Sequence, residues 1–207
     1  MGSIAVRAVI ELGVETVMPP LSTRGGKLAT DIQNHAEVAG YSKTPDGWFV
    51  PITALMDKVE AVVDYLHFEA RYYKEFEVCG GFEILTEDGH SIGVSLGSTF
   101  PFAMELAETV FQLSHENKSC RAFIDNDLYL NLTLENENIR IVPGHMARHI
   151  PQDEYLIPAE ELRQGMGSAK GEVERFVSEI EPLLTKLSDT PISSQLVRQM
   201  FGLAQVN

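Results

Sequence analysis

The hydrophobic positions follow a helical period in some stretches and a period of two in others. Over residues 53–73, apolar side chains recur every three or four positions, which predicts an amphipathic helix. Residues 101–115 repeat this pattern, with Pro101 near the expected first turn. Residues 75–96 and 121–142 contain shorter apolar runs that are divided by turn residues. Neighbouring strands joined by such short turns predict mostly antiparallel sheets.

The regions outside these stretches are predicted from weaker signals. Residues 4–12 alternate in part and predict a strand, whereas residues 143–157 are predicted to be a loop. The C-terminal region reads as helical, with a short helix at 158–164, a break at 165–167, and a further helix that Ser168 caps. We expect Pro182 to kink this further helix, and we predict a final amphipathic helix over residues 193–204.

Together these patterns predict an α+β fold. The two groups of antiparallel strands would be flanked by the helices at 53–73 and 101–115 and followed by a helical C-terminus. We expect residues 1–157 to form an α+β domain, and residues 158–207 to form a helical extension that packs on the same domain.

The composition is that of an ordinary folded domain. Hydrophobic residues make up 44% of the 207 residues and charged residues 22%, so the chain can bury a core without metals or disulfides. Cys79 and Cys120 lie in no metal-ligand series, and the sequence leaves open whether they pair. No cofactor is expected. We see no apolar run long enough for a membrane span and no leader pattern at the N-terminus, and we therefore expect a cytoplasmic protein.

The charge balance narrows the classes of partner. Thirty acidic residues against sixteen basic ones give a formal net charge of −14. The excess is spread along the chain: the first fifty residues carry five acids and four bases, whereas residues 51–100 carry nine acids and three bases. A field of this sign disfavours nucleic acid and anionic membranes. It favours a basic protein partner, chiefly by speeding the encounter.

We therefore predict a non-enzymatic interaction protein, such as an immunity protein, another inhibitor of a basic toxin or nuclease, or a chaperone. Carboxylates would face lysine and arginine side chains of the partner. Two helix faces are candidates, one on the 53–73 helix and one in the 172–181 segment. The candidate binding residues are Asp57, Glu60, Asp64, Glu172, Glu174 and Glu179. An assembly subunit that docks through its terminal helices is an alternative, and a homo-oligomer is left open.

One short motif suggests an enzyme instead. Gly93-Val94-Ser95-Leu96-Gly97 fits the pattern G-x-S-x-G between a predicted strand and a predicted helix. On these five residues the chain resembles an α/β-hydrolase. That resemblance implies that Ser95 is a nucleophile, with Asp125 and His145 as the acid and the base that follow it in the chain. His145 and His149 are also four residues apart, but the prolines around them favour a solvated loop over a metal site.

Overall fold

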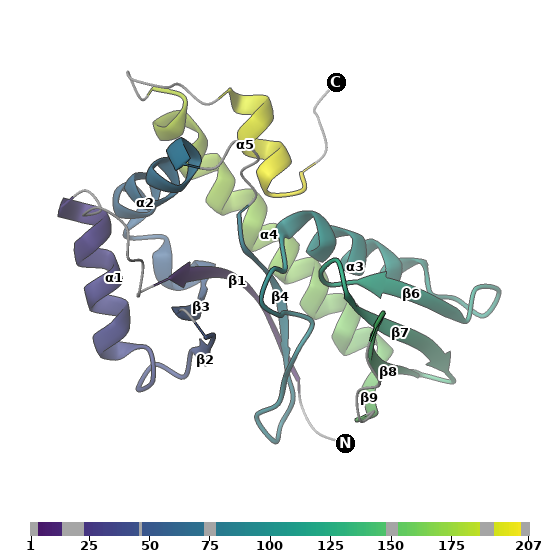
Figure 1. Ribbon diagram of the computed structural model, residues 1–207. Helices are drawn as coiled ribbons and strands as arrows, with labels where there is room; N and C mark the ends of the chain where they lie inside the picture. The colour runs from purple at the N-terminus through teal and green to yellow at the C-terminus, as the bar shows by residue number, and fades with distance from the viewer. Residues whose placement is uncertain are drawn as a thin grey trace.

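The computed structural model describes residues 4–13, 23–45, 47–72, 78–147, 153–186 and 193–203. Within these ranges the chain is an α+β protein with two antiparallel sheets and a helical C-terminus, which confirms the predicted fold class (Figure 1). Neither Cys79 nor Cys120, both of which are described, forms a disulfide. No helix among the described residues is long and apolar enough to cross a membrane.

The first sheet has the N-terminal strand in its centre, in the order β2-β3-β1-β4-β5. Its strands are β1 (Ala5–Gly13), β2 (Ser42–Lys43), β3 (Gly47–Pro51), β4 (Gly80–Leu85) and β5 (Ser91–Ile92). The hairpin expected within residues 75–96 is present as β4 and β5, which pair through Ile84 and Ile92. It joins a larger sheet because β1, whose middle residues Ala8, Val9 and Ile10 are buried, pairs with β3 on one side and β4 on the other.

The second sheet is a meander in which each strand pairs with the next, in the order β6-β7-β8-β9. Its strands are β6 (Ser119–Phe123), β7 (Leu128–Glu135), β8 (Asn138–His145) and β9 (Tyr155–Pro158). In β7 the leucines at 130, 132 and 134 are buried and alternate with half-buried polar residues, as the period of two predicts. The β7–β8 turn falls at Asn136, whose φ of 56° lies in the left-handed region.

The prediction of a loop over residues 143–157 is wrong at both of its ends. Strand β8 continues through His145, and residues 155–157 belong to β9, which ends at Pro158. Ile157 of β9 is buried opposite Ile139, so tertiary burial provides the signal that this short run lacks in the sequence.

The helices predicted at residues 53–73, 101–115 and 193–204 are present, with different ends. The helices of the described residues are α1 (Thr23–His35), the 3-10 helix η1 (Ile52–Leu55), α2 (Val59–Tyr72), α3 (Phe100–Gln112), α4 (Ala159–Leu184) and α5 (Ser194–Met200). The helix predicted at 53–73 is divided in two, because η1 buries Ile52 and Leu55 before a turn leads into α2.

The expected helix break at residues 165–167 is wrong, because α4 runs without interruption from Ala159 to Leu184. A Cβ atom at Gly165 would lie 2.5 Å from Cγ2 of Val6, so the glycine allows α4 to pack directly on β1. Pro182 lies two residues before the end of α4. The glycine marks a close contact between elements, although in the sequence it resembles a helix breaker.

A single apolar cluster joins both sheets and the helices. Figure 1 shows α4 running behind the strands, past α2 at one end and the second sheet at the other. After α5, Phe201 is fully buried, and its ring lies 5.0 Å from that of Phe100 and 6.0 Å from that of Phe176. The C-terminal helices are therefore packed on their own chain, and Ser193 caps α5 by accepting a hydrogen bond from the Leu196 N–H.

Candidate functional site

The structure joins two members of the predicted catalytic group by a hydrogen bond that does not include the third. The hydroxyl of Ser95 donates a hydrogen bond directly to Asp125, and it also lies 3.2 Å from the Ser98 hydroxyl. Asp125 is buried, and its other oxygen accepts the backbone N–H groups of Asp127 and Leu128 at 2.6 and 2.7 Å. This arrangement fastens the loop before α3 to the turn between β6 and β7.

His145 takes another position. Its Nδ1 accepts a hydrogen bond of 3.0 Å from the Ala147 N–H, and no hydrogen bond joins it to Ser95 or Asp125. In a serine hydrolase the histidine lies between the nucleophile and the acid, where it takes the proton of the hydroxyl. Here the carboxylate occupies the place next to the hydroxyl. His149, the other half of the weighed metal pair, lies outside the described residues.

The backbone around Ser95 also differs from that of the resembling family. An α/β-hydrolase elbow follows a strand of a mainly parallel sheet, whereas β5 is a two-residue edge strand that pairs antiparallel to β4. The positive φ angles of the motif belong to Gly93 (88°) and Gly97 (90°), and not to the serine. A Cβ atom at Gly93 would lie 2.6 Å from the Phe82 carbonyl oxygen. The five-residue motif therefore serves here as a tight passage from β5 toward α3.

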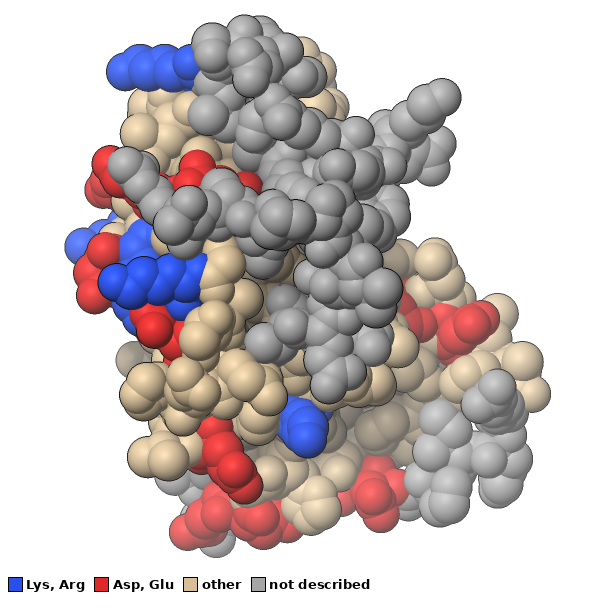
Figure 2. All heavy atoms as spheres, turned by 60° about the vertical axis from the view of Figure 1, so that its left-hand side comes forward, with Lys and Arg blue, Asp and Glu red and all other residues tan. Residues whose placement is uncertain are grey.

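The first predicted acidic face, on α2, is mixed in charge. Asp57 and Glu60 are exposed and Asp64 is half-buried. A groove of about 550 Å³ between α1 and α2 contains three acids in its lining and two lysines, namely Asp31, Asp57, Glu60, Lys27 and Lys58. On the face shown in Figure 2, blue and red side chains likewise lie side by side at the left. This region does not present an uninterrupted acidic surface.

The second predicted acidic face, in α4, is divided between two sides of the helix. Residues seven apart lie above one another, so Glu172 shares a side with Glu179, whereas Glu174 shares another side with Glu181. Glu172 is half-buried and accepts the Ala8 N–H of β1 at 3.4 Å, while Glu181 pairs with Arg198 at 3.6 Å. Glu174 and Glu179 are exposed, but they do not belong to one face.

A further acidic group, which the sequence did not single out, surrounds a groove of about 670 Å³. We refer to it as the acidic groove. Its rim carries three exposed carboxylates, those of Glu137 in the β7–β8 turn and of Glu160 and Glu161 in the first turn of α4. A backbone hydrogen bond of 2.8 Å from the Ala159 N–H to the Glu137 carbonyl joins the two segments. The three acids therefore converge although more than twenty residues separate them in the chain.

The other residues that line the acidic groove determine whether the three carboxylates are neutralised. Arg163 is the arginine in this lining, and one of its Nη atoms donates to the Leu113 carbonyl at 2.7 Å. Among the described residues, no ion pair joins Glu137, Glu160 or Glu161 to a basic side chain. The lining also contains Ser114 and His115, and it is completed by apolar and amide side chains, those of Leu113, Leu134, Asn136, Asn138, Pro158 and Ala159. The sequence shows acids at each segment, but only the fold shows that they meet.

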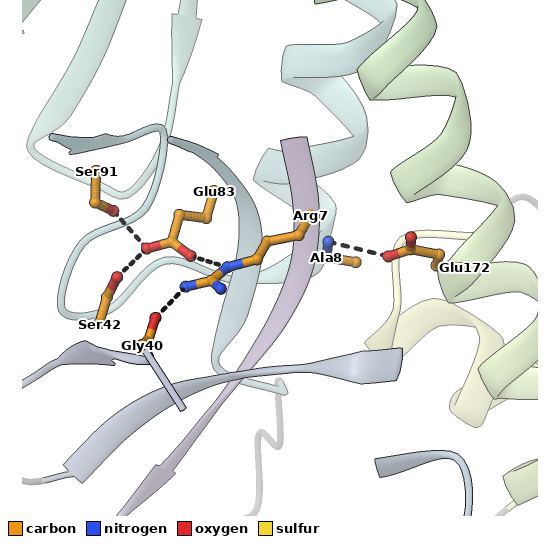
Figure 3. A network of polar contacts seen from close by, with 7 residues as sticks. All are labelled: Arg7, Ala8, Gly40, Ser42, Glu83, Ser91 and Glu172. Atoms are coloured by element: carbon orange, nitrogen blue, oxygen red, sulfur yellow. Dashed lines mark hydrogen bonds and ion pairs between the residues drawn. The ribbon is translucent and has the colours of Figure 1, made fainter. Parts of the chain in front are cut away.

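A buried polar network lies at the other side of the molecule, in the first sheet. Glu83 is fully buried, and it pairs with Arg7 of the adjacent strand at 2.5 Å (Figure 3). It also accepts the hydroxyl groups of Ser42 and, at 2.6 Å, Ser91, while Arg7 donates to the Gly40 carbonyl at 3.2 Å. Every oxygen of the carboxylate is therefore used within the chain, so we interpret Glu83 as a structural group.

A smaller groove of about 510 Å³ lies where the β4–β5 turn meets β9. Burial, followed by the negative charges of Asp153 and Asp88, raises the pKa of Tyr155 above its usual value. The hydrogen bond from the Thr86 hydroxyl lowers the pKa of Asp88. No group of three or more His, Cys, Asp and Glu side chains in the described part of the chain is placed to hold a metal ion.

The comparisons with known proteins give no family. No family model, no curated protein and no solved structure matches the chain. The candidate function therefore rests on the geometry and the charge described above.

Proposed function

We propose that this protein is a non-enzymatic binding protein whose acidic groove takes a basic side chain of a protein partner. One observation carries the proposal: three carboxylates from two separate segments meet around one groove, and they have no basic partner among the described residues. Other exposed acids of the described chain, such as Glu108 and Glu154, are paired with Lys170 and Arg140.

The groove combines the two features that such an interface needs. Carboxylates at the rim attract and orient a lysine or arginine, and the apolar residues at the floor, such as Leu113 and Pro158, can cover the aliphatic part of that side chain. Removing the three carboxylates from water is costly unless cations pair with them. A partner that covers this region must therefore supply its own basic side chains. The overall charge of −14 would speed the encounter with that partner. An immunity protein, another inhibitor or a chaperone would use such a surface to cover its target.

A capture experiment with two matched variants tests this proposal. The tagged protein is incubated with a lysate of the cells that produce it, at about 0.1 M and about 1 M salt, where the Debye length is about 10 Å and about 3 Å. The groove variant carries Glu137→Gln, Glu160→Gln and Glu161→Gln. The control variant carries Glu105→Gln, Glu174→Gln and Glu179→Gln, which change the net charge equally at exposed positions outside the groove.

We expect the unmodified protein and the control variant to capture the same basic protein at low salt, and the groove variant to lose it. Capture by the unmodified protein should also decrease at high salt. Equal capture by the groove variant and the unmodified protein would contradict the assignment of the groove. If only the control variant fails to capture the basic protein, the interface lies at the exposed acids of α3 and α4 and not at the groove.

A further inference from the structure

Strand β6 begins the second sheet, and among the described residues no strand pairs with its outer edge. The hydrogen bonds from the Ile124 N–H to the Leu128 carbonyl (3.0 Å) and from the Leu134 N–H to the Lys118 carbonyl (2.7 Å) show which residues face β7. By the alternation of an antiparallel ladder, Cys120 and Ala122 also bond to β7. The backbone groups of Ser119, Arg121 and Phe123 therefore point to the open edge.

The side chain in the middle of this edge is fixed in place without an acidic partner. The guanidinium of Arg121 lies 4.1 Å from the ring centre of Tyr129, and its Nε donates to the Asn131 side chain at 3.3 Å. Arg121 is exposed, and among the described residues no carboxylate pairs with it. Its two Nη atoms remain available, on a chain that has almost twice as many acids as bases. A guanidinium that stacks on an aromatic ring and keeps its Nη donors available can bind a carboxylate through two parallel hydrogen bonds.

The charge of Arg121 indicates which chain fits beside β6. A residue added directly opposite Arg121 would place its side chain on the same face of the sheet, about 5 Å away between Cβ atoms. A second copy pairing β6 with β6 about a two-fold axis at Arg121 would set two arginines opposite each other, which is unfavourable. An aspartate or glutamate in that place would meet the open guanidinium, and a residue two positions away would contact the ring of Phe123.

We propose that β6 binds an extended, carboxylate-bearing segment of a partner protein as an added strand. The outward backbone groups of Ser119, Arg121 and Phe123 hold the segment, and Arg121 selects an acidic residue at its centre. The proposal is independent of the acidic groove, because it uses a different surface and the opposite charge.

Selection from a displayed library of random dodecapeptides on the unmodified protein tests the proposal. Affinities of an enriched peptide are then measured for variants that separate the two contributions. Arg121→Gln removes the charge, and Ser119→Pro removes one outward N–H without touching the ladder to β7. Ser119→Thr keeps that N–H, and Arg175→Gln removes an exposed arginine of α4 as the matched control.

We expect enriched peptides to carry an acidic residue with an apolar residue two positions away. Both Arg121→Gln and Ser119→Pro should weaken binding at least tenfold, whereas Ser119→Thr and Arg175→Gln should leave it unchanged. When the acidic residue of the peptide is replaced by its amide, the unmodified protein and the Arg121→Gln variant should bind the peptide with the same affinity. The proposal is overturned if no peptide depends on Arg121, if Ser119→Pro binds normally, or if sedimentation shows a dimer that Arg121→Gln strengthens.

Discussion

At the scale of single residues, buried carboxylates connect segments that are distant in the chain. Glu83 joins β1, β2 and β5 through Arg7, Ser42 and Ser91, and Asp125 joins the β6–β7 turn to the loop that precedes α3. Each is surrounded by donors, as a buried charge must be. Both are therefore explained by the fold, without a ligand.

Replacing Glu83 by Gln should lower the free energy of unfolding by about 3 kcal/mol, because it leaves Arg7 without its charge partner in a partly buried place. Chemical denaturation measures this loss. The double variant Arg7→Met, Glu83→Gln should be more stable than Glu83→Gln alone, since the unpaired cation is gone. A double variant that is less stable than both single variants would contradict this account of the network.

Ser95 should behave as a structural residue. Ser95→Ala removes one hydrogen bond to the buried Asp125, and we expect a loss of about 1–2 kcal/mol in unfolding free energy. Ser178→Ala is the matched control, since its hydroxyl donates only to the Arg175 carbonyl within α4. We also expect no labelling of Ser95 by a fluorophosphonate probe. Labelling that disappears in Ser95→Ala would restore the hydrolase hypothesis.

At the scale of elements, contacts between α4 and its neighbours decide what the local sequence leaves open. Helix α4 carries three glycines among its first thirteen residues, a composition that locally favours a break. The helix continues because its buried side, including Leu162, Met166, Ala169 and Val173, packs on the core. Gly165 permits the closest part of this contact.

Two glycine-to-alanine substitutions in α4 should therefore have opposite signs. Gly165→Ala should destabilise the protein by about 1–3 kcal/mol, because the new methyl group would overlap Val6. Gly171→Ala should stabilise it by up to about 1 kcal/mol, since that position is exposed and has open space around it. Thermal unfolding of both variants measures the difference. Equal effects would show that α4 does not rest on β1 through Gly165.

The elements that could be predicted are those whose pattern is complete within one segment. In β7, α2 and α3 the spacing of the apolar residues predicts which side chains are buried. These elements and the antiparallel arrangement therefore follow from the sequence. Strand β9 and the unbroken α4 depend on neighbours that are far away in the chain. The central position of β1 likewise depends on pairing with two strands that lie more than thirty residues later.

At the scale of the whole molecule, the sequence gives the sign of the charge but not where it gathers. The acids that the sequence suggests as the binding residues lie elsewhere. Glu60 lies in a groove that also contains lysines, and Glu172 accepts a hydrogen bond from β1. The acidic groove instead joins a hairpin turn to the first turn of a helix. Glu160 and Glu161 also interact favourably with the helix dipole there, so their presence at that position has a local reason as well.

Hydrogen–deuterium exchange of the protein, alone and mixed with the basic partner captured at low salt, shows whether the partner covers the acidic groove. We expect slower exchange at the amides that surround the groove, in residues 113–116, 136–138 and 159–163. The groove variant should lose this protection and the control variant should keep it. Protection confined to other segments, such as residues 57–64 or 172–181, would contradict the claim that the acidic groove is the binding site.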